Sequence, residues 1–167
     1  ARYDRVVIAA HSDQALRLLA DPSERERELL AAFPYQENST VLHTDATLLP
    51  RRRAAWASWN YYIPPLPGER ATVTYHMNRL QNLAAPVEFC VTLNRDRDID
   101  PAAIIKKIMY HHPVYRLQAP LAQKRWPEIN GVNNTCFCGA YWGNGVHEDG
   151  VVSALANNSI KVFSTLS

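Results

Sequence analysis

Hydrophobic and polar positions follow two different periods along this chain. The unbroken apolar run Val6-Val7-Ile8-Ala9-Ala10 predicts a strand over 5–10 that is buried on both faces. Helical spacing follows, and it predicts helices over 13–20 and 24–32, with Ser23 as the N-cap of the second. The N-terminal part is therefore expected to be a strand followed by two helices.

From residue 38 to residue 94 the pattern changes to a period of two. It predicts strands over 40–44, 56–62, 71–77 and 88–93. Proline or glycine punctuates the intervals at 49–51, 64–68 and 85–86. Short strands separated by such turns favour an antiparallel meander.

The remaining third mixes both periods. Asp98-Ile99-Asp100-Pro101 is a helix-start signal, and it predicts a helix that ends near Met109. Residues 113–134 are expected to be extended and irregular. A last strand is predicted over 135–138, and Gly150 is expected to open a last helix that ends near Ala156, before a break at 157–159. The fold class predicted is α+β, a mostly antiparallel sheet with flanking helices.

Composition excludes several classes of protein. The chain has 167 residues, of which 47% are hydrophobic and 20% charged, as in an ordinary folded domain. A net charge of +2 is too small to indicate nucleic acid as a partner. The sequence has no secretory signal and no long apolar run, and its three cysteines lack the spacing of a disulfide framework. We therefore expect a cytoplasmic protein with no transmembrane segment.

The segment 137–155 carries the most specific candidate chemistry. It holds four of the six glycines, placed between a predicted strand and a helix start. Glycine lets the backbone approach a ligand closely, and a helix start presents unpaired N–H groups that suit an anion. This arrangement predicts a cradle for a nucleotide cofactor. Its spacing, G-x3-G-x-G-x4-G, matches no dinucleotide or phosphate-loop fingerprint, so a structural loop packed by aromatic side chains is the alternative.

The polar candidates in and near this segment each have a structural alternative. Asp149 is expected either at the ligand or as an N-cap or first-turn carboxylate of the helix. His147 could titrate near neutral pH or serve as a hydrogen-bonded support. The adjacent pair His111-His112 lacks the spacing of a metal site. No metal is therefore predicted.

Aromatic and basic residues of the middle segment also leave two interpretations open. Trp59 and Tyr61 share one face of a predicted strand, where they either pack in the core or form one wall of an apolar substrate pocket. The run Arg51-Arg52-Arg53 is interpreted as a solvated turn, with an anionic group as the alternative ligand.

Several stretches together resemble one known family. Phe137-Cys138-Gly139, the Trp142-x-x-Gly145 loop and the stretch 148–153 resemble the closing segment of flavin-containing amine oxidases and the related NAD/FAD-binding dehydrogenases. The stretch 5–11 is similar to the strand that precedes the substrate domain in that fold. Trp59-Asn60-Tyr61 and the stretch 123–127 resemble a bacterial branch of such flavoproteins. The resemblance implies an FAD-dependent oxidoreductase in which the flavin accepts a hydride from a small-molecule substrate.

The resemblance also implies which residues meet FAD. Residues 1–37 and 135–157 would belong to the FAD-binding part, and residues 38–134 to the substrate-binding part. Backbone groups at the diphosphate would come from Gly139 and Ala140, whereas the remaining contacts, near the flavin ring, would come from His147, Asp149, Gly150 and Val151.

One element of that family is missing from this sequence. The N-terminal G-x-G-x-x-G fingerprint, which supplies most of the FAD affinity, is absent. The resemblance therefore implies the C-terminal portion of a flavoprotein, which by itself is expected to be inactive and to bind FAD weakly or not at all. No catalytic residue is assigned. The rival hypothesis is a non-enzymatic module whose aromatic sheet face docks a partner. An exposed strand at 5–10 would also favour self-association.

Overall fold

The computed structural model describes residues 3–64 and 72–156, and it is a mixed α+β structure. The predicted turn at 64–68 beyond Pro64 and the break at 157–159 lie outside the described residues. Contacts divide the chain into two units: unit 1 comprises Ala1–Gln36 and Pro113–Ser167, and unit 2 comprises Glu37–His112. Residues 113–134, which the resemblance grouped with the substrate part, belong to unit 1.

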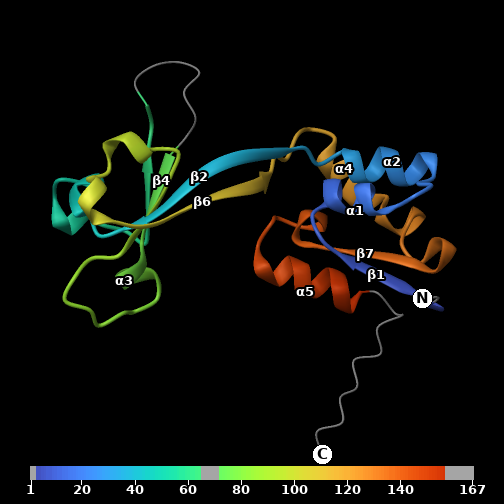
Figure 1. The fold of residues 1–167 in the computed structure, drawn as a ribbon. Helices are drawn as coiled ribbons and strands as arrows, with labels where there is room; N and C mark the ends of the chain where they lie inside the picture. The colour runs from blue at the N-terminus through green and yellow to red at the C-terminus, as the bar shows by residue number, and fades with distance from the viewer. Residues whose placement is uncertain (1–2, 65–71, 157–167) are drawn as a thin grey trace, which may run out of the picture. The chain divides into compact units, whose positions relative to one another are not determined.

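Unit 1 is built around two parallel strands that come from distant parts of the sequence. β1 (Val6–Ala9) pairs with β7 (Thr135–Cys138), in a register that places Ile8 opposite Phe137. Figure 1 shows helices on both sides of this pair, with α5 on the side away from α1, α2 and α4. The helices are α1 (Ser12–Leu18), α2 (Glu24–Ala31), α4 (Ala119–Lys124) and α5 (His147–Leu155), with 3-10 turns at Trp126–Glu128, Val132–Asn134 and Ala140–Trp142.

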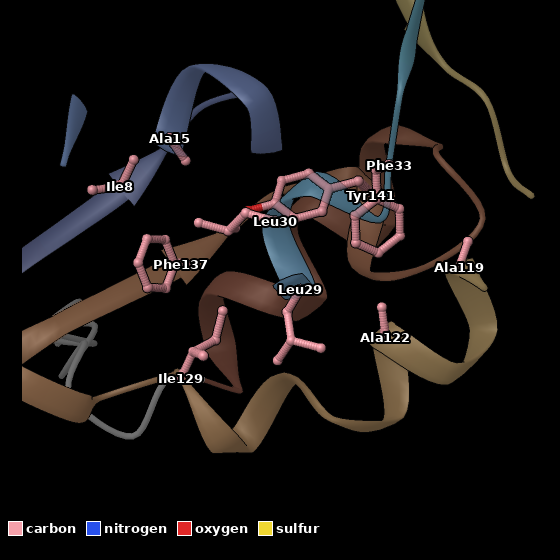
Figure 2. Close-up of a cluster of buried hydrophobic side chains, with 10 residues drawn as sticks. All are labelled: Ile8, Ala15, Leu29, Leu30, Phe33, Ala119, Ala122, Ile129, Phe137 and Tyr141. Carbon is pink, nitrogen blue, oxygen red and sulfur yellow. The ribbon is translucent and has the colours of Figure 1, made fainter. Parts of the chain in front are cut away.

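A hydrophobic core holds unit 1 together. Figure 2 shows that its side chains come from both strands, from the first, second and fourth helices, and from the segments next to them. Phe33, Phe137 and Leu30 are fully buried in it. The edge-to-face contact of Phe33 with Trp142 fixes the loop after β7 against this core. The core members are Ile8, Ala15, Leu29, Leu30, Phe33, Ala119, Ala122, Ile129, Phe137 and Tyr141.

Unit 2 is organised on a five-stranded, mostly antiparallel sheet, as the period-two pattern predicts. Its strand order is β3-β4-β5-β2-β6. Tyr35 and Gln36 at the start of β2 and Pro113 at the end of β6 are assigned to unit 1. One short helix, α3 (Met77–Leu80), follows β4. The strands are β2 (Tyr35–His43), β3 (Trp59–Tyr62), β4 (Thr72–His76), β5 (Cys90–Leu93) and β6 (Ile104–Pro113), with 3-10 turns at Ala46–Leu48, Arg53–Ala55, Asp96–Asp98 and Pro101–Ala103.

The helix predicted over 98–109 is wrong. Asp100 does act as an N-cap, because its side chain accepts a hydrogen bond from the Ala102 amide. The element that it caps is only a single 3-10 turn. The chain then continues as β6, a ten-residue strand at the edge of the sheet. Pairing with the neighbouring strand overrides the local helix signal at this position.

Three other expectations are corrected. The strand at 5–10 is not buried on both faces, since Val6 and Val7 are 45% and 41% exposed and only Ile8 is buried. Residues 113–134 are not all irregular, because they contain α4. The last helix begins at His147, which places Gly150 inside it rather than at its start.

Candidate functional site

The loop after β7 is fastened to the helix that follows it. The Ser153 hydroxyl accepts a hydrogen bond from the backbone amide of Gly139 (2.9 Å) and donates one to the carbonyl of Gly150 (2.8 Å). Ser153 is 3% exposed, so both bonds are shielded from water. A Cβ atom on Gly150 would lie 3.8 Å from the Ala140 amide nitrogen. The structure therefore brings Gly139, Ala140 and Gly150 together.

Asp149 is a first-turn carboxylate of α5. Its Oδ2 atom accepts hydrogen bonds from the backbone amides of Asn144 (2.9 Å) and Val146 (3.0 Å). This carboxylate satisfies amides that the helix itself cannot pair, and it lies at the positive end of the helix dipole. The structural alternative for Asp149 is confirmed, and the side chain has a role that does not require a ligand.

Three of the four glycines in the loop are explained by the fold. A Cβ atom on Gly139 would clash with the Tyr141 ring, and one on Gly143 would clash with the Asp149 carboxylate. Gly145 has a φ of +90°, and its Cβ atom would lie 2.8 Å from the Tyr115 hydroxyl. Tyr141 and Asp149, from the loop and its helix, fill the first two spaces, and Tyr115, from a different part of the chain, fills the third. Gly150 differs, because only ordinary van der Waals contact would meet a Cβ atom there.

The start of α5 is the part of the loop that faces solvent. His147 and Glu148 are exposed, and Val151 in the next turn is 51% exposed. The amides of a helix's first residues have no carbonyl partner within the helix. In α5 the Asp149 amide donates to the Val146 carbonyl, and the Asp149 carboxylate already lies at the helix start. The first turn therefore offers a ligand only its remaining exposed backbone, and the Gly139 amide is used by Ser153.

Sequence reasoning missed the side chains that line the same edge from other elements. Because β1 and β7 are parallel, both end at this edge. His11, the N-cap of α1, stacks on Tyr35 with 4.5 Å between ring centroids, and the Tyr35 hydroxyl accepts the Ser12 amide. The Tyr115 hydroxyl donates to the Ala140 carbonyl at 3.4 Å, and burial raises the pKa of Tyr115 to about 12, which keeps it a donor. A pairing of distant segments brings them here, which no local pattern predicts.

The sheet of unit 2 has one apolar face that we call the open face. Residues opposite each other in neighbouring strands share a face, so the register places Trp59, Tyr75, Val91 and Leu42 in one row across it. Trp59 is 63% exposed, and Tyr61, on the same face of β3, is 66% exposed. These two aromatic residues are not in the core, so the core-packing interpretation is wrong.

A groove of about 490 Å³ lies on the open face. Strands β2, β5 and β6 supply its apolar surface, and the segment that includes α3 closes one end. The lining residues are Thr40, Leu42, Met77, Gln81, Leu83, Phe89, Val91, Lys106, Ile108 and Tyr110. Its volume is in the range of small-molecule sites.

The opposite face of the sheet holds a buried polar network. The Asp45 amide donates to His43 Nδ1, which places the ring proton on Nε2, and this atom donates to the Thr92 hydroxyl at 2.8 Å. Burial lowers the pKa of His43, so the ring is neutral. The Thr92 hydroxyl also lies 2.9 Å from that of Thr74. The network is satisfied within the fold and has a structural role.

A second histidine on that face is held by a hydrogen bond to a carboxylate. His76 Nε2 lies 2.7 Å from Glu88 Oε2, and the other oxygen of Glu88 accepts from Arg53 Nη2 at 2.9 Å. Trp56 packs edge-on against the His76 ring. Arg53 therefore pairs with Glu88. Arg51 and Arg52 are exposed, as the interpretation of this run as a solvated turn predicts.

Residues 3–64 and 72–156 contain no group of three or more His, Cys, Asp or Glu side chains that could hold a metal ion. In the same residues no helix has both the length and the apolar character needed to cross a membrane. All three cysteines are free thiols and buried.

Comparison with known proteins leaves the chain without an assigned family. No protein-family model matches the sequence, and the search of the curated proteins gives no match.

Proposed function

We propose that this chain is the C-terminal part of an FAD-dependent oxidoreductase related to the flavin-containing amine oxidases. In this proposal unit 1 contributes contacts to the FAD and the open face of unit 2 contributes the substrate-binding wall. When bound, FAD supplies the hydride acceptor, and the residues of this chain bind the FAD and the substrate and orient them.

The observation that carries the proposal is the strand–loop–helix from β7 to α5, placed beside β1. Two parallel strands that end at one edge, with helices starting there, form the kind of edge at which α/β folds bind nucleotide ligands. The stretches 137–139, 142–145 and 148–153, which resemble the closing segment of the amine oxidases, lie in this strand–loop–helix, and the stretch 5–11 contains β1. The open face adds the apolar surface that the resemblance assigns to substrate.

The fit of the expected FAD contacts is uneven along the loop. Gly150 and the exposed first turn of α5 suit a cofactor, because no side chain fills the space beside Gly150 and the first turn faces solvent. Ala140 suits one only through its amide, since the Tyr115 hydroxyl already donates to its carbonyl. The Gly139 amide does not suit one, since Ser153 already accepts its hydrogen bond. The Asp149 side chain caps the helix, so its contribution would be to hold the first turn in place.

The test is the flavin content of the protein purified from its complete reading frame. We expect a yellow protein that releases FAD on denaturation, and a Gly150→Leu variant that retains less FAD because the added side chain would extend over the Ala140 amide. Val152→Leu, in the same helix at a position that is 54% exposed, is the matched control and should retain FAD. A colourless protein that FAD does not affect would refute the proposal.

A non-enzymatic binding module is the second candidate. The specific observation that favours it is the exposure of Trp59 and Tyr61, since large exposed aromatic side chains are enriched at protein interfaces. Stable, saturable binding of a protein partner that Trp59→Ser abolishes, in a protein that does not bind FAD, would establish it.

A further inference from the structure

We propose that the groove on the open face binds a small apolar molecule that carries one anionic group, with the anion at Lys106. This inference rests on the proposed function, because it names the substrate class for the face assigned to substrate.

The shape and surface of the groove indicate a small ligand with an apolar body. Leu42, Val91 and Ile108 come from three neighbouring strands and form a continuous apolar floor. At about 490 Å³ the volume of the groove suits a molecule of drug size. Contact with this floor would bury apolar surface of the ligand, which is the main source of affinity for such a body.

Lys106 provides the charge that selects the ligand. Of the described residues that line the groove, it is the one with a charged side chain. Across residues 3–64 and 72–156 no carboxylate lies within ion-pair distance of its ammonium group, whereas the neighbouring Lys107 pairs with Asp96. An ammonium group beside an apolar floor complements a carboxylate, sulfonate or phosphate on an apolar molecule.

The two adjacent lysines give the proposal a matched control. Lys106 lines the groove on the open face, and Lys107 lines a different groove together with Asp96 and Ser39. Successive side chains of a strand point to opposite faces, as these linings require. Removing either charge changes the net charge of the protein equally, but only Lys106 lies at the proposed site.

The experiment compares two dyes that share one apolar body. Anilinonaphthalene sulfonate carries an anion, and phenylnaphthylamine is the same body without it; both fluoresce when bound to apolar surface. The full chain and its variants Lys106→Met and Lys107→Met are titrated with each dye. We expect Lys106→Met to weaken binding of the sulfonate about three- to fivefold, the effect of losing one partly exposed ion pair, and to leave the neutral dye unchanged. Lys107→Met should change neither affinity.

A second variant tests the apolar floor. Val91→Thr keeps the side-chain shape and its preference for strands but adds a hydroxyl to the floor, so it should weaken both dyes to a similar extent. Equal losses for both dyes in Lys106→Met, or the same loss in Lys107→Met, would overturn the role of Lys106. An absence of saturable binding of either dye would overturn the groove as a small-molecule site.

The outcome is separable from that of the flavin test. The dyes report on unit 2, and FAD retention reports on the loop of unit 1. A protein that binds both dyes as expected but no FAD would refute the proposed function and leave the anion-binding groove in place. Retention of FAD with no dye selectivity would do the reverse.

Discussion

The glycines of the loop between β7 and α5 give the sharpest test of what the fold requires and what a ligand would require. We consider Gly143→Ala and Gly150→Ala, two identical substitutions seven residues apart in the same loop and helix. At Gly143 the new methyl group would collide with the Asp149 carboxylate, whereas at Gly150 it would meet ordinary contact. The structure therefore predicts effects of opposite sign.

The magnitudes follow from the contacts. Displacing Asp149 removes the acceptor for the amides of Asn144 and Val146, and losing a helix cap costs about 0.5–2 kcal/mol. Gly150 lies within α5, where replacing glycine with alanine favours the helix by about 0.8–1 kcal/mol. The stability of this segment in the two variants should thus differ by about 1.3–3 kcal/mol.

The assay is amide hydrogen exchange of the full chain, read by mass spectrometry on peptides that cover 140–156. Because 1.4 kcal/mol corresponds to a factor of ten, exchange of these amides should be roughly ten- to 100-fold faster in Gly143→Ala than in Gly150→Ala. Peptides from β4 and β5, in unit 2, serve as the internal control and should exchange equally. If Gly150→Ala loosened α5 as much as Gly143→Ala, the argument that Gly150 is not needed by the fold would be refuted.

Two further predictions concern unit 2. Glu88→Ala leaves Nε2 of the buried His76 without its acceptor, so it should lower the free energy of unfolding in urea by about 1–3 kcal/mol. Arg53→Ala removes a side chain that is 80% exposed and should cost less than about 1 kcal/mol. Equal effects of the two variants would contradict the role of Glu88 as the partner of His76. For Asp96, burial alone would raise the pKa, but hydrogen bonds from Lys107 and Ser39 outweigh it and lower the pKa below the usual value. Its stabilising contribution is therefore complete above the unfolded pKa of about 4 and is lost as pH falls through the folded pKa, so Asp96→Asn should flatten the loss of stability measured between about pH 5 and pH 2. An unchanged slope in that variant would show that other groups dominate acid unfolding.

The sequence predicted those elements whose local pattern and tertiary role agree. Alternation in 71–77 and 88–93 corresponds to β4 and β5, and Ser23 caps α2, where its hydroxyl accepts a hydrogen bond from the Glu26 amide. The prediction failed where long-range strand pairing determines the secondary structure. Before β6, Asp100 caps a single turn, and the residues that follow pair with the sheet instead of forming a helix. The burial of Val6 was also misjudged, because an apolar run does not reveal how many strands flank it.

The candidate site was predictable only in part for a similar reason. The local segment 139–150 identified the loop and the role of Asp149, since both depend on residues close in sequence. It did not identify Tyr115 or Tyr35, which reach the same edge from other elements, or Ser153, whose hydroxyl occupies the Gly139 amide. The separation of Lys107, which pairs with Asp96, from Lys106, which lines the groove on the open face, also depends on the folded sheet.

The discontinuity of unit 1 has a consequence for how the chain is made. β1 is synthesised early, but its pairing partner β7 leaves the ribosome only after all of unit 2 has been translated. During that interval Val6 and Val7 belong to an unpaired strand with no native neighbour, a state in which nascent chains are prone to aggregate. Most of the core of unit 1 can therefore form only after unit 2 has been translated, whereas unit 2 is continuous in sequence and does not depend on a later segment for its strand pairing.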